Sequence, residues 1–556
     1  MKTRTLIALQ LVTIATLVGC DATPLYIGFM RVDGGGGAVS TSTTSTAGGA
    51  GGAGGAGGAG GALLCSPGAT QPCYSGPAGT EGQGICEVGT QVCAADGMSW
   101  AACSGEVLPG VEDCATAEDE DCDGLAPPCK GSLLWAKRFG DSGEQIAQSV
   151  AIDSAGNIIV VGHFNGTIDF GGGPMISSSL DAFVVKLDAA GNHLWSKQFA
   201  ASVQDRMSVA VDSAGDIVVA GVVAGAADFG GGPVASAGGS PDIFVVKLDA
   251  SGGHVWSKLL GDAATQGGPI LGVDASGDVV IGGWFFGEVD LGSGPLVSSG
   301  QADIFVAKLD ASGDPIWSRA FGSAAGFRGI GGIGVDGANG CIVAGTFSGT
   351  LDLGGGVLSS AGGKDVFVSK LDSNGDHVWS ARFGDASDQT VSAFGVNAAG
   401  NIVMGGNPGF SVDFGGGALL GSGGADIFLV KLTWTGEYTW GMRMGDASDQ
   451  SVKGLALGAT GSVAATGHFD GSVDFGGGPQ QSAGGHDAFL AKLDEHGDHL
   501  WSKRFGDNDG QYGTGVAVSS EEAAVVVGYF AGKIDFGGGP LVSAGSSDVF
   551  IAAFAP

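Results

Sequence analysis

A passage of about 61 residues recurs along most of the chain, and it constrains the fold more than any other feature. Each copy opens on a Trp-containing stretch such as WSKQF, continues through a segment such as VAVDSAGDIVVAG and a DFGGGP turn, and closes with DIFVVKLD. Repeats of this length bury their apolar faces against one another, so we expect residues 131–556 to form one repeat domain. The tryptophans that open the seven copies are Trp135, Trp195, Trp256, Trp317, Trp379, Trp440 and Trp501.

The residue pattern within each copy predicts strands. Runs such as Asn157–Val161 and Ile243–Leu248 are rich in Val, Ile and Phe and are bounded by Gly, Asp, Asn and Ser. Four short antiparallel strands make one blade, and seven blades around an axis close the sheet edges. The sequence therefore predicts an all-β fold, a seven-bladed β-propeller of four-stranded blades. In the third copy we expect the four strands near Ile270–Val273, Asp278–Gly282, Asp303–Leu309 and Pro315–Phe321.

An open β-solenoid is the alternative architecture, but its repeats are shorter and need caps at both ends. The two ends of the repeat domain favour the propeller. The last copy stops after Asp548–Phe554, before its Trp-bearing strand, whereas the first copy begins with a spare strand at Leu133–Phe139. We expect these two strands to pair, because pairing completes the seventh blade and leaves no unmatched edge.

The repeat also resembles a known family. GNIIVVGHFNGTIDFGGG, followed by DAFVVKLDAAGNHLWSKQF, is similar to the SBBP-type bacterial β-propeller repeat over essentially all of residues 131–556. The resemblance implies a propeller in a secreted or surface protein. It implies no particular ligand, because a fold does not carry a function by itself.

The N-terminus has the layout of an export signal. Lys2 and Arg4 precede the apolar run Leu6–Val18, which is too short for a comfortable membrane span. The run ends in LVGC, which resembles the lipobox of bacterial lipoproteins, and the resemblance makes Cys20 the lipidated residue. We expect residues 1–19 to be a signal peptide and the exported chain to be tethered to a membrane by lipid, at the outer membrane or cell surface ahead of the inner membrane. An uncleaved anchor is the alternative.

The composition of residues 20–62 predicts a linker. The segment Gly34–Ala62 consists of glycines, a Ser/Thr run and repeated GGA, with almost no apolar side chains to bury. We expect a disordered stalk with an end-to-end distance of about 35–40 Å between Cys20 and Cys65.

Residues 63–130 form a cysteine-rich segment. An even number of cysteines this dense in an exported segment predicts up to four disulfides stapling a small domain, with the pairing left open. A zinc site is disfavoured, because the segment has no CxxC pair and no histidine. Cys341 lies in a strand pattern, so we expect a buried thiol there. The disulfide candidates are Cys65, Cys73, Cys86, Cys93, Cys103, Cys114, Cys122 and Cys129.

The same segment contains a candidate cation site. Asp119, Asp121 and Asp123 followed by Gly124 fit D-x-D-x-D-G, the first half of a calcium loop, but the twelfth position is Lys130 in place of a bidentate Glu. The stretch EDEDCDG also resembles MopE-type metal-binding motifs, which implies copper. The oxygen ligands favour calcium over copper, and a solvated acidic turn without metal is the alternative.

Two acidic positions recur in all seven copies, and we interpret both as structural, because a catalytic group is needed once and a turn residue is needed in every blade. Asp bonding the amides of a tight turn beside glycine explains them. The histidines His193, His254, His377 and His499 share one repeat position, and His163 and His468 share another. The acidic sets are Asp169, Asp228, Asp290, Asp352, Asp413, Asp474 and Asp535, and Asp181, Asp242, Asp303, Asp365, Asp426, Asp487 and Asp548.

The sequence supports three classes of function. The first, which we favour, is a non-catalytic scaffold that binds a protein or glycan; nucleic acid is disfavoured by the formal charge of −33. The second is an extracytoplasmic enzyme in the channel, although no catalytic motif and hence no catalytic residue is identified. The third is metal binding by the cysteine-rich segment. For the enzyme, a channel site would be built from residues that differ between blades, such as Trp284-Phe285-Phe286, Arg328, Asn407-Pro408 and Trp434.

Overall fold

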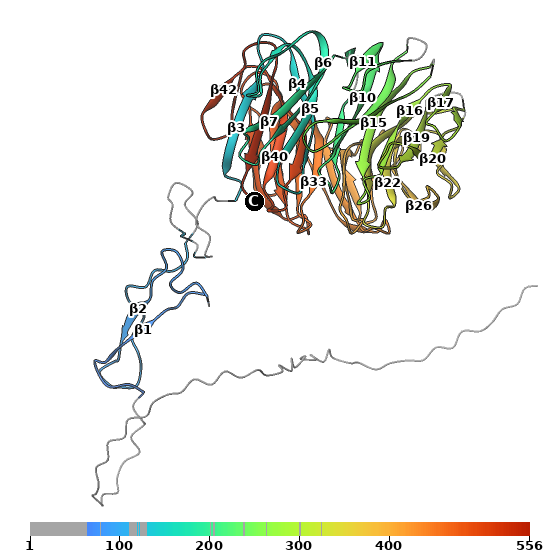
Figure 1. Cartoon of the computed structure of the whole chain (residues 1–556). Helices are drawn as coiled ribbons and strands as arrows, with labels where there is room; N and C mark the ends of the chain where they lie inside the picture. The colour runs from blue at the N-terminus through green and yellow to red at the C-terminus, as the bar shows by residue number, and fades with distance from the viewer. Residues whose placement is uncertain are drawn as a thin grey trace, which may run out of the picture.

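The computed structural model describes residues 64–556 apart from 78, 111–118, 121, 123–129, 201, 204–205, 237–239, 263, 300–301 and 324. The signal peptide, Cys20 and the linker predicted above lie outside the described residues. Within the described part, a small cysteine-rich segment precedes a ring of antiparallel sheets (Figure 1). That part contains no helix long and apolar enough to cross a membrane.

The described residues of the ring form seven four-stranded sheets, as predicted. The first strand of each sheet lines the axis, and the strands then run outward with antiparallel neighbours. From the axis outward, the first three sheets are β4 (Gln145–Ile152), β5 (Ile158–Ile168), β6 (Met175–Leu187), β7 (His193–Phe199); β9 (Ser208–Val211), β10 (Ile217–Ala224), β13 (Asp242–Leu248), β14 (His254–Leu260); and β15 (Gln266–Val273), β16 (Val279–Phe285), β19 (Asp303–Leu309), β20 (Pro315–Phe321). The short strand β8 (Ser202–Val203) also pairs with β10.

The next three sheets repeat the same order. They are β21 (Arg328–Val335), β22 (Cys341–Phe347), β25 (Asp365–Leu371), β26 (His377–Phe383); β27 (Thr390–Val396), β28 (Ile402–Asn407), β31 (Ile427–Leu432), β32 (Tyr438–Met444); and β33 (Gln450–Leu457), β34 (Val463–Phe469), β37 (Asp487–Leu493), β38 (His499–Phe505).

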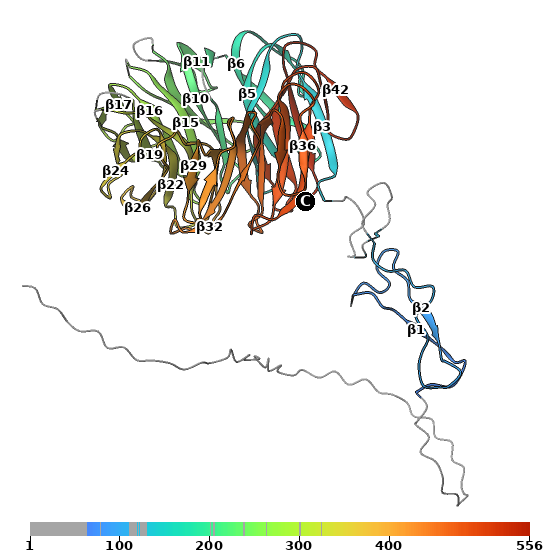
Figure 2. The same ribbon diagram turned by 180° about the vertical axis from the view of Figure 1, so that it is seen from behind.

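The seventh sheet is shared between the two ends of the repeat domain. Its inner strands are β39 (Gln511–Val518), β40 (Ala524–Phe530) and β43 (Asp548–Phe554), and its outer strand is β3 (Leu133–Phe139). The strands β3 and β43 are antiparallel, with Phe139 opposite Val549, and they lie side by side in both views (Figures 1 and 2). The predicted closure of the ring is confirmed.

Tryptophan and glycine join each blade to the next. The Trp317 ring lies against Gly375 in the β25–β26 hairpin, so closely that a methyl group on Gly375 would be 2.7 Å from the ring, and the φ of +77° at Gly375 also favours glycine. The indole N–H of Trp317 donates to the Ser373 carbonyl of the same hairpin. The equivalent donations are Trp135 to Ala189, Trp195 to Ala250, Trp256 to Ala311, Trp379 to Trp434 and Trp440 to Glu495.

The seventh contact between a tryptophan and a glycine joins the two ends of the repeat domain. The Trp501 ring packs on Gly131, which has φ of +68° and whose N–H donates to the carbonyls of Ala555 and Pro556. Gly131 thus takes the place of the hairpin glycine that the truncated last copy lacks. The Trp501 indole nitrogen is buried without a hydrogen-bond partner. In the other blades the indole donates to a carbonyl of the hairpin between the third and fourth strands, and in the seventh sheet β43 and β3 are not joined by such a hairpin.

Apolar side chains from adjacent sheets form the core. One cluster joins Phe164 and Phe183 of the first sheet to Val527 and Ile551 of the seventh, and the other clusters repeat this arrangement around the ring. The recurring aromatic residues are therefore packing residues, as interpreted from the sequence. Cys341 is a buried free thiol, and burial raises the pKa of that thiol.

The Gly-rich turns form an element that the sequence reading did not predict. In six blades a short hairpin lies between the second and third strands, whereas the first blade continues β5 and β6 in its place. Asp169 accepts hydrogen bonds from the amides of Gly171 and Gly173, and every copy repeats this pair of bonds. The hairpins are β11 (Ala226–Asp228) with β12 (Pro233–Ala235), β17 (Glu288–Asp290) with β18 (Pro295–Val297), β23 (Thr350–Asp352) with β24 (Val357–Ser359), β29 (Ser411–Asp413) with β30 (Ala418–Leu420), β35 (Ser472–Asp474) with β36 (Pro479–Gln481) and β41 (Lys533–Asp535) with β42 (Pro540–Val542).

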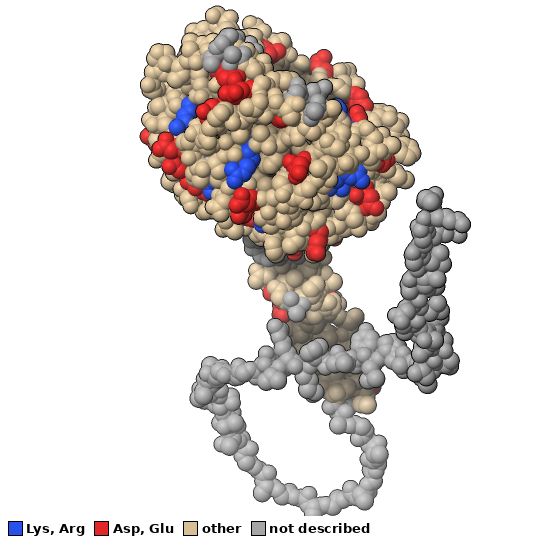
Figure 3. Space-filling model, turned by 90° about the vertical axis from the view of Figure 1, so that its right-hand side faces the viewer, with Lys and Arg blue, Asp and Glu red and all other residues tan. Residues whose placement is uncertain are grey.

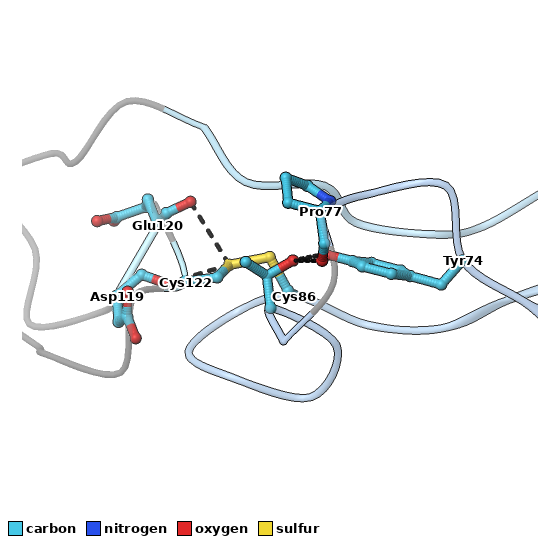
Figure 4. Close-up of a disulfide and its surroundings, with 7 residues drawn as sticks. Tyr74, Pro77, Cys86, Asp119, Glu120 and Cys122 are labelled. Atoms are coloured by element: carbon cyan, nitrogen blue, oxygen red, sulfur yellow. Dashed lines mark hydrogen bonds between the residues drawn. A yellow bond between two sulfur atoms is a disulfide. The ribbon is translucent and has the colours of Figure 1, made fainter. Parts of the chain in front are cut away.

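The cysteine-rich segment has one described sheet, in which β1 (Thr70–Cys73) pairs with β2 (Gly89–Val92). Its described cysteines form three disulfides, which supply the staples that so small a core needs. The pairs are Cys65–Cys93, Cys73–Cys103 and Cys86–Cys122, the last of which is drawn in Figure 4. Cys114 and Cys129 lie outside the described residues.

Candidate binding site on the mouth face

One end of the ring carries several residues that differ between blades. We call this end the mouth face: it is where the first strand of each sheet begins and the second strand ends, as at Gln145 and Phe164. Two of the surface cavities lie on this face, one on blades three and four and one on blades six, seven, one and two. A third cavity occupies the channel below, between the seven inner strands.

The cavity on blades three and four has aromatic walls. It has a volume of about 530 Å³, and its lining includes Trp284, Phe286 and Phe327. Trp284 and Phe286 meet edge to face with ring centroids 5.8 Å apart, and the Lys364 ammonium lies 4.4 Å from the Phe327 ring centroid. The next blade presents Phe410 at the same end of its sheet. We call Trp284, Phe286, Phe327 and Phe410 the aromatic arc.

Among the departures from the repeat, Trp284, Phe286 and Arg328 lie together at this cavity. The others do not. Phe285 is fully buried in the core, and Asn407 accepts a hydrogen bond from the Gly409 amide in the turn after β28. Trp434 lies in the β31–β32 hairpin, at the end of its sheet opposite the mouth face.

Arg328 is a structural residue, although sequence reasoning made it a candidate for function. Its side chain is fully buried where five other blades have a described glutamine, and its guanidinium donates to the carbonyls of Gly326, Ala325 and Thr350. It also lies 3.7 Å from the Asp303 carboxylate. Burial lowers the pKa of Arg328, and Asp303 opposes that change.

The second set of recurring aspartates explains why this arginine is needed. In four blades the equivalent carboxylate is fully buried and pairs with an arginine three residues after the Trp, and Arg504 with Asp487 is an example at 2.6 Å. The blade of Asp303 has Ala320 at that arginine position. Arg328 therefore neutralises Asp303 from the start of the next blade.

The cavity on blades six, seven, one and two has a basic and aromatic lining that sequence reasoning did not predict. Lys453, Arg206, Tyr512 and Tyr529 line it, together with His163 and His468. Lys453 had a recognisable signal: it lies at a repeat position that holds Ser392 and Thr514 in the neighbouring blades. We call these six residues the cationic pocket.

The two histidines of the cationic pocket are neutral at ordinary pH. Burial, together with Lys453 and His486, lowers the pKa of His468 to about 3, and burial lowers the pKa of His163. His163 lies 3.9 Å from Glu144, and His486 lies 2.9 Å from Asp470.

The other four repeated histidines are packing residues. The rings of His193, His254, His377 and His499 cover glycines of the Gly-rich turns, and each ring bonds a serine three residues on. In the part of the chain that the structure describes, no histidine bonds both a carboxylate and a hydroxyl, which is the arrangement that a Ser/His/Asp site needs.

Of the predicted cation ligands, only Asp119 is a described residue. It is buried beside the Cys86–Cys122 disulfide (Figure 4). Its backbone carbonyl accepts a hydrogen bond from the Ile85 amide. Asp121 and Asp123 lie outside the described residues. No group of three or more His, Cys, Asp or Glu residues suited to a metal occurs among the residues that are described. The calcium site therefore stays a prediction.

Comparison with known proteins places few constraints on function. No protein-family profile matches the chain. A stretch of 101 residues is 34% identical to an uncharacterised WD repeat-containing protein of Acanthamoeba polyphaga mimivirus, covering 16% of this chain and 7% of the viral protein.

Solved structures that resemble the chain include two propellers. The Neurospora crassa Pan2 WD40 domain is 9% identical, with a TM-score of 0.36 over 73% of this chain and 88% of that one. The β-propeller domain of the Trilobed protease from Pyrococcus furiosus is also 9% identical, with a TM-score of 0.37 over 75% of this chain and 94% of that one. The fold assignment rests on the sheets described above.

The role of Arg328 can be tested by moving the charge. Arg328→Gln restores the glutamine of the other blades but leaves the buried Asp303 unpaired, so we expect a loss of about 3 kcal/mol in the free energy of unfolding. Adding Ala320→Arg supplies the arginine that other blades use and should recover much of that loss. Urea unfolding measures both variants, and an Arg328→Gln variant as stable as the wild type would contradict the assignment.

Proposed function

We propose that the protein is an exported lipoprotein whose propeller is a non-catalytic scaffold that binds a protein or glycan at the cell surface through the mouth face. The observation that carries the proposal is the exposure of the aromatic arc. Phe286, Phe327 and Phe410 are 43%, 47% and 74% exposed, although the repeat buries most of its other phenylalanines.

Exposed aromatic side chains are the anchors that binding surfaces use. They bury a large apolar area at little cost in side-chain entropy, and they are enriched at the centres of interfaces. In this protein Trp284, Phe286 and Phe327 line a hollow of about 530 Å³, and Phe410 lies at the same end of the next blade. Glycans also stack on such rings through their C–H faces, so a protein and a glycan are both suitable ligands.

The net charge of the chain favours a protein or glycan over nucleic acid as the ligand. The chain carries a formal charge of −33, which repels nucleic acid and anionic lipid surfaces. Acidic and basic side chains are interspersed on the side of the propeller drawn in Figure 3. A basic track along which a nucleic acid backbone could run is not visible there.

The proposed lipid anchor would place the scaffold at a membrane surface. Lipidation at Cys20 would supply more than one acyl chain, which is enough for stable attachment, and residues 20–62 would hold the folded part away from the membrane. The disulfides of the cysteine-rich segment support an exported protein, because such bonds persist in oxidising compartments.

Docking on the aromatic arc predicts a loss of binding when the arc is removed. The variant F286A/F327A/F410A should bind its ligand at least about 100-fold more weakly, because anchor residues each contribute more than about 1 kcal/mol. Biolayer interferometry against a panel of purified cell-envelope polysaccharides and surface proteins measures this. Trp434→Ala, which removes an equally exposed aromatic at the opposite end, is the matched control. A panel ligand that the triple variant binds as tightly as the wild type would refute docking on the arc.

Tethering through Cys20 is tested separately. Cys20→Ser removes the thiol that accepts the first lipid, so we expect the variant to move from the membrane fraction to the soluble extracytoplasmic fraction. Cell fractionation followed by immunoblotting measures the shift, with Cys341→Ser as a control that removes a thiol from the propeller. Unchanged membrane association of the Cys20→Ser variant would contradict lipid tethering.

A further inference from the structure

The cationic pocket and the channel meet at Lys453. The pocket at the mouth has a volume of about 440 Å³, and the channel cavity below has about 220 Å³. Four residues line both cavities: Gln148, Arg206, Lys453 and Thr514. A molecule in the pocket would therefore place one end at Lys453 and Arg206.

The described charged residues that line the two cavities at this junction are basic. Neither cavity has an Asp or Glu among the described residues that line it. Lys453 has no hydrogen bond and no ion pair with any described residue. The Arg206 guanidinium reaches across the channel to within 3.5 Å of the Ser392 carbonyl oxygen. A partly buried lysine without a partner among the described residues attracts an anion into the cavity, even in a chain of net charge −33.

This charge has a cost that the fold does not offset. Burial lowers the pKa of Lys453, and the nearby Arg206 lowers it further. A lysine that serves only structure normally has a partner, as Lys186, Lys247 and Lys308 do in this protein, where each lies within 3 Å of an aspartate. Lys453 is therefore placed as a ligand-binding lysine would be.

The walls of the pocket are suited to a planar organic group. Tyr512 and Tyr529 stack with ring centroids 4.9 Å apart, and His468 packs edge-on against Tyr512 at 4.9 Å. Neutral His468 and His163 each have a buried Nδ1 atom without a hydrogen-bond partner. A volume of about 440 Å³ falls in the range of small-molecule sites, which combine apolar walls with a few polar groups.

We propose that the cationic pocket binds a small aromatic carboxylic acid, with the carboxylate held by Lys453 and Arg206 at the head of the channel and the ring placed against Tyr512, Tyr529 and His468. The two cations match the charge and hydrogen-bonding needs of a carboxylate, and the aromatic walls exclude water from the ring of the ligand. This site lies on blades six, seven, one and two and is separate from the aromatic arc on blades three to five, so it adds a second ligand to the proposed scaffold.

Isothermal titration calorimetry on the full mature chain tests the site with benzoate as the probe. Benzamide has the same shape without the charge, and inorganic phosphate has the charge without the ring. We expect benzoate to bind and both comparison probes to bind at least about tenfold more weakly, because a charge-assisted hydrogen bond and ring packing each contribute that much.

Three variants locate the binding. Lys453→Met keeps the length of the side chain and removes the charge, so benzoate affinity should fall at least about tenfold, whereas Lys453→Arg should keep it. Lys533→Met removes an exposed lysine on the outer hairpin and should leave affinity unchanged. Because Lys453 makes no ion pair, the Lys453→Met variant should melt at or above the temperature of the wild type, which separates loss of binding from loss of fold.

Several results would overturn the proposal. It fails if benzoate gives no heat at millimolar concentration, if benzamide or phosphate binds as tightly as benzoate, or if Lys453→Met binds benzoate unchanged. None of these outcomes bears on docking at the aromatic arc, which is measured with a different ligand and different residues.

Discussion

The structure depends on the contact of each tryptophan with a glycine in the next blade. The contact fixes the spacing of neighbouring blades. The indole ring packs so closely on Gly375 and its equivalents that a Cβ there would clash, and the indole N–H donates a hydrogen bond to the same hairpin. A ring of blades closes only if the last contact is made like the others. Gly131 provides that contact for Trp501, and β3 then adds the missing strand beside β43.

A closed ring of this kind assigns most recurring residues to structure. The Asp before each Gly-rich turn bonds two amides, and the buried Asp at the third strand pairs with arginine in four blades. Four of the repeated histidines cover glycines. The candidates for a functional role are then the residues that occur in only one blade. Even among these, Arg328 compensates for the alanine at position 320. Lys453 and the exposed phenylalanines of the arc have no such structural explanation, so the proposed binding sites rest on them.

Much of the fold could be predicted from local patterns, because strand composition and the repeat period are local properties. The expected strand Asp303–Leu309 has those bounds in the structure, and the pairing of Leu133–Phe139 with Asp548–Phe554 followed from the repeat phase alone. The small hairpins that contain the Gly-rich turns were missed, because their three-residue strands are too short to show alternation.

The candidate sites were less predictable, because they depend on which end of a sheet a residue occupies and on its burial. Trp434 and Trp284 look equally unusual in sequence but lie at opposite ends of their blades. Arg328 looked functional and is buried among carbonyls. Lys453 was missed because a single lysine in an acidic chain reads as a solvated charge until the ring places it beside Arg206, Tyr512 and His468.

Closure by the N-terminal strand can be measured directly by comparing two truncations. A chain that begins at residue 131 keeps Gly131 and β3, whereas a chain that begins at residue 140 loses both and exposes the edge of β43. We expect the melting temperature of the first to match that of the full chain and the melting temperature of the second to fall by about 10 °C or more, because a strand and an inter-blade contact are lost. Equal melting temperatures for the two truncations in differential scanning calorimetry would contradict the account.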